Sequence, residues 1–306
     1  MPIPATPIAT TTAGSIIQSV RDQIPDRVTN LASDGDTFTL SSLVNWINDA
    51  MREIAIASRC VLDFYAIQSS SSQDVYELPT TLLQVEQLWY DLKPCTRSAA
   101  LDDFFTTFIS GNSWFFDPAF TVGSIPRMHL WPAPSRTGAT GTLSATLTAT
   151  ATAISATADI AAIMKYGYIG IENEIIRYTS FNHTTFAFGG VLRAQAGTIA
   201  AAHTAPVTIT ELNIWFKCSK LPTPITGPGD PIQIPNALVP LIELYVLSKC
   251  REAEQEAQLA HAMRQEFAQA ITTLAQNSAI KGLRQGIQVR NQTEGPLLYG
   301  GRLYVP

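Results

Sequence analysis

Charged side chains are scarce in this sequence, and the common motifs of catalysis are missing from it. Asp, Glu, Lys and Arg make up 15% of the 306 residues, against about 25% in average globular domains. The chain holds no glycine-rich phosphate loop, no Gly-x-Ser-x-Gly and no Gly-x-Gly-x-x-Gly, which excludes the usual nucleotide-binding and serine-hydrolase signatures. We therefore expect a globular protein that is not an enzyme and that exposes less charged surface than a free monomer.

Long apolar runs are absent as well. No stretch reaches about 18 consecutive apolar residues, so we expect no transmembrane helix and no membrane partner. The N-terminus lacks the basic and apolar regions of a secretory signal peptide. The net charge of -5 argues against nonspecific nucleic-acid binding through a basic face.

Cysteine and histidine are few and widely spaced. No two cysteines form a Cys-x-x-Cys pair, so we expect buried thiols in a reducing compartment, at Cys60, Cys95, Cys218 and Cys250. No histidine lies at metal-ligand spacing from Cys, Asp or Glu, which applies to His129, His183, His203 and His261. The sequence therefore predicts neither a metal nor a cofactor.

Two pairs of carboxylates have the residue types that general acid–base catalysis uses. Asp102 and Asp103 are adjacent, and adjacent residues do not face one another. Glu172 and Glu174 flank a predicted turn. We interpret both pairs as solvated surface.

The longest regular pattern covers residues 237–277, where apolar residues recur at three- and four-residue steps. This segment has no Gly, and its one Pro, Pro240, lies in the first turn of the predicted helix. The stripe thins to alanine across residues 251–256, so the segment is either one long helix or an αα-hairpin. We expect its second half to pack in a buried helix seam, within or between subunits, through Ala260, Met263, Phe267, Ala270 and Leu274.

Two shorter helices are predicted near the N-terminus. Ser15 is a suitable cap for a helix that ends at Ile24, before Pro25. Thr39 or Ser41 caps a second helix with a strong apolar period. Its polar pair Asn48-Asp49 is expected on the solvated face.

Strand signals begin at Val61. Residues 61–68 and 74–78 are predicted to form a hairpin, and residues 83–91 another strand. Residues 99–109 form a possible short helix. An aromatic cluster follows, and it fits core packing or a subunit contact better than a sugar-stacking platform; its members are Trp114, Phe115, Phe116 and Phe120.

The composition shifts to Ala, Thr and Gly over residues 135–210. Residues 168–178 alternate as a tight hairpin with Glu172-Asn173 at its turn. Because the flanking strands, residues 125–131 and 212–219, are expected to face each other, we predict an inserted all-β module at the tip of a hairpin.

The C-terminal segment, residues 283–306, alternates turn residues with apolar ones and is too apolar for a solvated tail. One alternative is that this segment packs back on its own subunit. We favour an extended tail that docks on a neighbouring subunit or another protein, as an added strand. Its candidate docking residues are Ile287, Val289, Leu297, Leu298, Tyr299, Leu303, Tyr304 and Val305.

Several segments occur in a specific order: LSSLVNWINDAMREIA, YELPTTLLQVEQLWYD, RMHLWPAPS, IWFKCSKLP and PNALVPLIELYVLSKCREAE. This order, over roughly residues 15–134 and 211–278, resembles the head-to-tail adaptor (connector, head-completion) proteins of tailed bacteriophages. Asn48 and Ala50 in the second helix and the strand entry at Leu78-Pro79 carry much of the resemblance.

The inserted block resembles a small β module common in phage structural proteins. Its three marks are IGIENEIIRYTS, GGVLRAQAGT and AAAHTA, around residues 169–180 and 189–205. The usual Arg-Gly of the second mark is Arg193-Ala194 in this chain.

The resemblance implies an α+β fold: a mainly helical adaptor core with a small antiparallel sheet, an inserted all-β module and an extended C-terminal tail. The expected division is an N-terminal arm (1–14), the core (15–134 and 211–282), the module (135–210) and the docking tail (283–306).

The resemblance also implies a function. The protein would form a homo-oligomeric ring, typically a dodecamer, in the virion neck, after synthesis in the host bacterial cytoplasm. Its partners would be the portal protein and a tail tube or nozzle protein, and double-stranded DNA would pass through its channel without specific binding. A competing hypothesis is a carbohydrate- or receptor-binding structural protein that uses the β module and the aromatic cluster.

Overall fold

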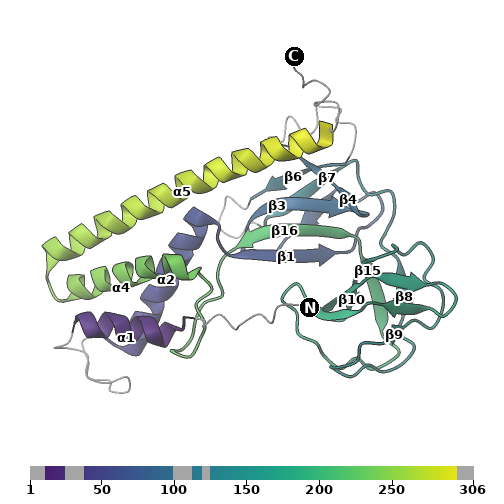
Figure 1. Cartoon of the computed structure of the whole chain (residues 1–306), viewed down its shortest axis with the longest axis horizontal. Coiled ribbons are helices and arrows are strands. Elements are labelled where there is room, and N and C mark those ends of the chain that lie inside the picture. The colour runs from purple at the N-terminus through teal and green to yellow at the C-terminus, as the bar shows by residue number, and fades with distance from the viewer. Residues whose placement is uncertain (1–10, 25–37, 99–111, 119–124, 295–306) are drawn as a thin grey trace, which may run out of the picture. The chain divides into compact units, whose positions relative to one another are not determined.

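A computed structural model describes residues 11–24, 38–98, 112–118 and 125–294, with side chains described as far as Asn277. These residues form four α-helices and sixteen strands in four sheets, about 32% strand against 29% helix (Figure 1). The prediction of a mainly helical core was therefore wrong. The error arises from the long central part of the chain, where the alternating segments all form strands. The helices lie only toward the two ends of the described chain.

The contacts divide the chain into two compact units. The first contains the residues up to Val61 together with Lys220–Gln288, and the second contains Leu62–Ser219 together with the residues from Val289 on. The division into arm, core, module and tail remains a prediction.

The first unit is helical, and its core is formed by the apolar stripes that the sequence shows. Thr12, rather than the predicted Ser15, caps the first helix, and Thr39 caps the second. Helix α4 (Val239–Ala253) packs against α1 (Ala13–Gln23) and α2 (Leu40–Ser58). No described helix is long and apolar enough to cross a membrane. The elements are α1 (Ala13–Gln23), α2 (Leu40–Ser58), the 3-10 turn η1 (Asn236–Leu238), α4 (Val239–Ala253) and α5 (Ala257–Glu294).

The long C-terminal pattern forms two helices rather than one. Helix α4 ends at Ala253, and Gln255 takes a left-handed φ of 66° in the connection. Helix α5 then continues to Glu294, so residues 283–294 are helical and the predicted extended tail does not begin at 283. Leu283, Arg284 and Gln285 favour a helix, and this preference outweighs the glycines on either side of them, Gly282 and Gly286.

Asn48 corrects a second expectation about the first unit. Its side-chain amide donates to the Ile225 carbonyl (3.0 Å) and accepts from the Ile225 N–H (2.8 Å). It therefore fastens the proline-rich connector to α2, while Asp49 is exposed as predicted.

The second unit contains two four-stranded sheets, and one hydrophobic core draws on both of them. Strand alternation supplies this core, since Ile214, Phe216 and Cys218 are buried while Trp215 and Lys217 between them point outward. The first sheet has the order β1 (Leu62–Ile67), β16 (Ile214–Lys220), β3 (Leu82–Tyr90), β4 (Lys93–Pro94). The second has the order β2 (Val75–Glu77), β7 (Arg127–Trp131), β6 (Ser113–Asp117), β5 (Thr96–Arg97).

The strands lie near their predicted positions, but two predicted pairings are wrong. The 74–78 segment pairs with β7 rather than with β1, and β16 pairs with β1 rather than with β7. A short turn makes neighbouring strands look like a hairpin in sequence, yet here β1 and β2 belong to different sheets.

Residues 139–212 form two further sheets around a core of their own. The predicted hairpin at residues 168–178 is confirmed, with Ile171 opposite Glu174 at its closed end. We call these two sheets the β module. The larger sheet has the order β14 (Leu192–Gln195), β11 (Glu174–Tyr178), β10 (Gly167–Ile171), β15 (Thr208–Leu212), β8 (Thr140–Thr142). The smaller has the order β12 (Ser180–Asn182), β13 (Ala187–Gly189), β9 (Ile154–Ser155).

Candidate functional site

The predicted docking residues lie at the end of the described chain. Ile287 and Val289 are in α5, and the other six fall within residues 295–306, outside the described part. Their role in docking remains a prediction.

The predicted helix seam lies along one face of α5. Ala260 is buried, and Phe267 is part of the first unit's core, where its ring lies 5.0 Å from the Tyr245 ring. Met263, Ala270 and Leu274 are half-buried. A role for this face in subunit packing remains a prediction.

The aromatic cluster is part of the second unit's core. Trp114 and Phe116 of β6 are buried, and the Trp114 indole N–H donates to the Cys95 carbonyl at 3.2 Å. Phe120 lies outside the described residues. The two buried rings are not available to stack on a sugar, whereas Phe115 between them is half-buried.

Glu174 stands at the centre of a polar cluster inside the β module. Strand β11 points it inward beside Ile176 and Tyr178, and its side chain is 1% exposed. Its two oxygens accept five hydrogen bonds: two from Arg193 (both 2.6 Å), one from His203 (2.8 Å), and one each from the Ala194 and Ala201 N–H groups (both 3.1 Å). The expectation of a solvated Glu174 was therefore wrong.

Arg193 uses its whole guanidinium in this cluster. Besides the fork to Glu174, it donates to three backbone carbonyls at 2.7–3.1 Å, which belong to Thr148, Ala151 and Ala201. All five N–H donors of the guanidinium therefore have partners. A buried ion pair is stable in this form because neither charge is left without hydrogen bonds.

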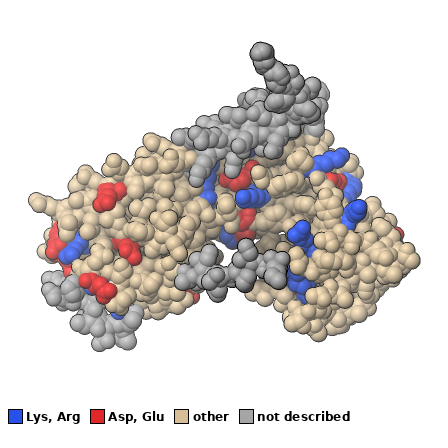
Figure 2. Space-filling view, viewed as in Figure 1, with Lys and Arg blue, Asp and Glu red and all other residues tan. Residues whose placement is uncertain are grey.

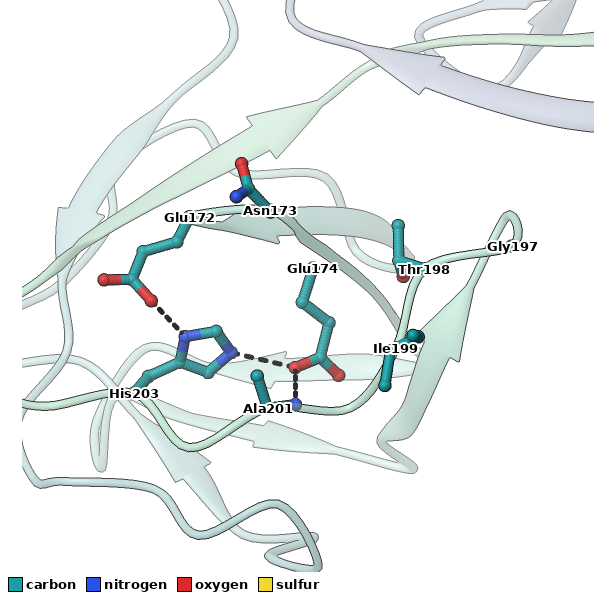
Figure 3. Close-up of a pocket in the computed structure, with 8 residues that line it drawn as sticks. All are labelled: Glu172, Asn173, Glu174, Gly197, Thr198, Ile199, Ala201 and His203. Carbon is teal, nitrogen blue, oxygen red and sulfur yellow. Dashed lines mark hydrogen bonds and ion pairs between the residues drawn. The ribbon is translucent and has the colours of Figure 1, made fainter.

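His203 joins the same cluster to the hairpin turn. Its Nε2 lies 2.8 Å from Glu174 and its Nδ1 lies 2.7 Å from Glu172. The histidine is 1% exposed, whereas Glu172 at the turn is 53% exposed. Figure 3 shows the imidazole between the two carboxylates, with the Ala201 N–H directed at Glu174.

These residues line an open pocket of about 740 Å³ between the β10–β11 turn and the 197–203 loop. Carboxylates and an imidazole are suited to proton transfer, but both ring nitrogens and both Glu174 oxygens are already occupied. Burial alone would raise the pKa of Glu174, yet its bonds to Arg193, His203 and two N–H groups hold that pKa at about 2. The cluster therefore fastens loops together and is poorly placed for catalysis.

A second ionic cluster attaches the β module to the rest of the second unit. Arg136 donates to Asp91, which follows β3, at 2.6 and 3.1 Å, and to Glu211 of β15 at 2.6 and 3.2 Å. Glu211 is fully buried and also accepts from two module N–H groups. We call Asp91, Arg136 and Glu211 the junction clamp.

Aromatic rings support the same junction. The Tyr168 ring of β10 lies 4.9 Å from Phe64 and 5.0 Å from Trp215. Polar and apolar contacts therefore both hold the module against the first sheet of the second unit.

Within the described ranges, no three His, Cys, Asp or Glu side chains are arranged to hold a metal ion. The four cysteines are free; Cys95, Cys218 and Cys250 are buried and Cys60 is half-buried. Burial raises the pKa of the Cys95 and Cys250 thiols to about 12, which makes these two thiols unreactive.

Neither cluster was predicted from the sequence, although the sequence contains one signal for the cluster around Glu174. Each of the three marks of the inserted block supplies one part of it: the carboxylates Glu172 and Glu174, then Arg193, then His203. In the folded module, hydrogen bonds of this cluster join the three segments, which are separate in the sequence.

The comparison with protein families gives one result. Residues 11–178, more than half of the chain, match the family model described as SU10 adaptor protein. No curated protein matches the chain.

Proposed function

The chain belongs to the SU10 adaptor protein family, a family of bacteriophage structural adaptors, and from this membership we propose that it forms the ring that joins the portal to the tail. Proteins of this family are structural components of the virion. In the proposed assembly, twelve copies of the chain form a homo-oligomeric ring that lengthens the DNA channel. The observation that carries the proposal is the family match over residues 11–178.

Surface chemistry supports the proposal of a ring. Large apolar side chains are exposed on two separate helices, at Ile56 of α2 and at Leu259 of α5, and a subunit contact would cover them. Charged side chains are sparse on the face drawn in Figure 2, where the β module is almost entirely uncharged apart from a few basic groups. The chain has 25 acidic and 20 basic residues and is therefore net negative. A negative channel suits the passage of DNA, because it repels the DNA phosphates and so does not bind them.

The proposed ring predicts a defined oligomer. The purified full-length chain should have a native mass that is a fixed multiple of 33.2 kDa, and negative-stain images should show rings with a central opening. If ring assembly needs the portal as a template, rings should form when the portal protein is added to the purified chain. A chain that stays monomeric in both conditions would contradict the proposal.

A further inference from the structure

Two exposed cations and two exposed leucines share one face of the second unit, which runs from its first sheet onto the β module. We propose that this face is a subunit contact and receives an acidic stripe of helix α2 from a second copy of the chain. The inference rests on the proposed ring and names the surfaces through which its subunits meet. We call this surface the basic face; its members are Leu62, Phe64, Tyr168, Arg177, Leu192 and Lys217.

Strand register places three of these side chains in a row on the β module. Arg177 of β11 pairs directly with Tyr168 of β10 on one side and with Leu192 of β14 on the other, so the three point to the same side of the sheet. The alternate residues of these strands, Ile169 and Ile176, are buried in the module's core. The row therefore lies on the outer side of the sheet.

The other members of the basic face lie on the first sheet of the second unit. Phe64 of β1 pairs directly with Lys217 of β16, and Leu62 points to the same side because it is two residues before Phe64. The ring of Tyr168 lies 4.9 Å from that of Phe64, which makes the two rows continuous. The neighbouring carboxylate, Asp63, alternates to the opposite side of the strand, so it is not part of this face.

The chemistry of the basic face is that of a protein interface. Aromatic residues and Arg are enriched in such interfaces, and the two leucines are 54% and 50% exposed, at Leu62 and Leu192. Arg177 and Lys217 are exposed and form no ion pair with any other described residue. A partner that fits this face would therefore carry carboxylates beside an apolar side chain.

The exposed side of α2 has this composition. Asp49, Glu53 and Ile56 lie at i, i+4 and i+7 of the helix, so they form one stripe. All three are exposed, with Ile56 at 50%, and neither carboxylate has an ion-pair partner in the described part of the chain. Arg52 is exposed beside them, which leaves a net negative charge. We call Asp49, Glu53 and Ile56 the acidic stripe.

A contact between these two surfaces has a consequence for assembly. The basic face and the acidic stripe are different surfaces in different compact units, and we assign the contact to separate copies of the chain. Such a contact is heterologous: each copy uses its basic face toward one neighbour and its acidic stripe toward the other. Heterologous contacts build rings when the rotation closes, whereas a two-fold contact stops at a dimer.

A charge-reversal experiment on the full-length chain tests this pairing. The face variant carries Arg177→Glu and Lys217→Glu, and the stripe variant carries Asp49→Lys and Glu53→Lys. Each variant alone would bring like charges together, so we expect loss of the rings. In an equal mixture of the two, every contact again joins opposite charges, so we expect rings of alternating copies. Native mass and negative-stain images, with and without the portal protein, are the measurements.

Lys93→Glu provides the control, since it reverses an exposed charge on β4, at the opposite edge of the same sheet from β1, and should leave the rings intact. The single change Lys217→Glu keeps the test decisive if a double variant does not fold. Rings that survive in the folded face and stripe variants, or a mixture that stays monomeric, would overturn this contact and leave the proposed ring standing. Wild-type chain that forms no ring in either condition would overturn the proposed function together with this contact.

Discussion

At the residue scale, the buried carboxylates of the second unit, Glu174 and Glu211, each lie in a cluster that supplies their partners. Glu174 shows how much of this the sequence contains: strand alternation places it on the same face as Ile176 and Tyr178, so a period of two predicts its burial. A charged carboxylate is nevertheless expected at the surface unless a counter-ion is known. The residue that neutralises Glu174, Arg193, lies nineteen residues away along the chain. Sequence periodicity identifies the buried face, but it does not identify a distant counter-ion.

Ala194 gives the first prediction at this scale. It adopts a left-handed φ of 55° and is exposed, and it occupies the position where the resembling phage modules have Gly. A left-handed conformation costs a non-glycine residue about 1–2 kcal/mol, so Ala194→Gly should stabilise the module by about 1 kcal/mol. Ala153→Gly is the matched control: Ala153 is exposed without a positive φ, and its change should be neutral or destabilising. An equal fall in the denaturant midpoint of Ala194→Gly and Ala153→Gly would contradict a cost of the left-handed conformation at Ala194.

The second residue-scale prediction concerns acid. The folded module holds the pKa of Glu174 at about 2, below its ordinary value of 4.5. Because the unfolded chain takes up this proton first, the stabilisation is fully present above pH 4.5 and is lost as the pH falls toward 2. The thermal midpoint of the module should drop through this range. A variant that lacks the module should not show this fall in the thermal midpoint between pH 4.5 and 2. An equal fall in both proteins would contradict the assignment of this acid dependence to Glu174.

At the element scale, the positions of helices and strands were predictable and their partners were not. The apolar stripe of α2 and the alternation of the β10–β11 hairpin are local patterns, and both elements formed where expected. The pairing of β16 with β1 joins residues about 150 positions apart, and no local pattern records it. The break between α4 and α5 was left open for a similar reason: residues 251–256 favour a helix locally, and the turn depends on how α5 packs.

The helix seam gives the element-scale prediction. Phe267 is buried against Tyr245 in the core of the first unit, and truncating a buried Phe to Ala costs about 3–5 kcal/mol. Phe267→Ala should therefore lower the unfolding midpoint markedly. Leu259→Ala, at an exposed position on the same helix, should change it little in the isolated subunit. If Phe267→Ala changes neither the midpoint nor the oligomer size, the seam is wrongly assigned.

At the scale of the whole molecule, the error in fold class has a specific origin. The prediction of a helical core rested on residues 237–277, the longest periodic segment, with the short strands as additions to that core. The β module extended the strand content further, since its many short strands of Ala, Thr and Gly carry weak individual signals. The family resemblance carried the function prediction, and the match over residues 11–178 supports it at the level of a phage structural adaptor.

The β module provides a prediction at this scale. Thr140 and Thr210 are directly paired across β8 and β15, so residues 141–209 can be replaced by Asn-Gly, which closes a two-residue hairpin. Arg136 keeps both of its partners in the junction clamp, Asp91 and Glu211, in this variant. We expect the shortened chain to unfold cooperatively, because the second unit's other core has none of its residues in the deleted segment. Loss of all cooperative unfolding would show that the module is not separable.

The central claim is that this chain joins a portal to a tail, and electron microscopy of the chain mixed with its portal tests it most directly. We predict single particles in which a ring of this protein sits coaxially on the portal ring, and loss of these particles when residues 283–306 are deleted from a chain that still folds. Full-length protein that never associates with the portal, or that binds it without forming a ring, would contradict the account.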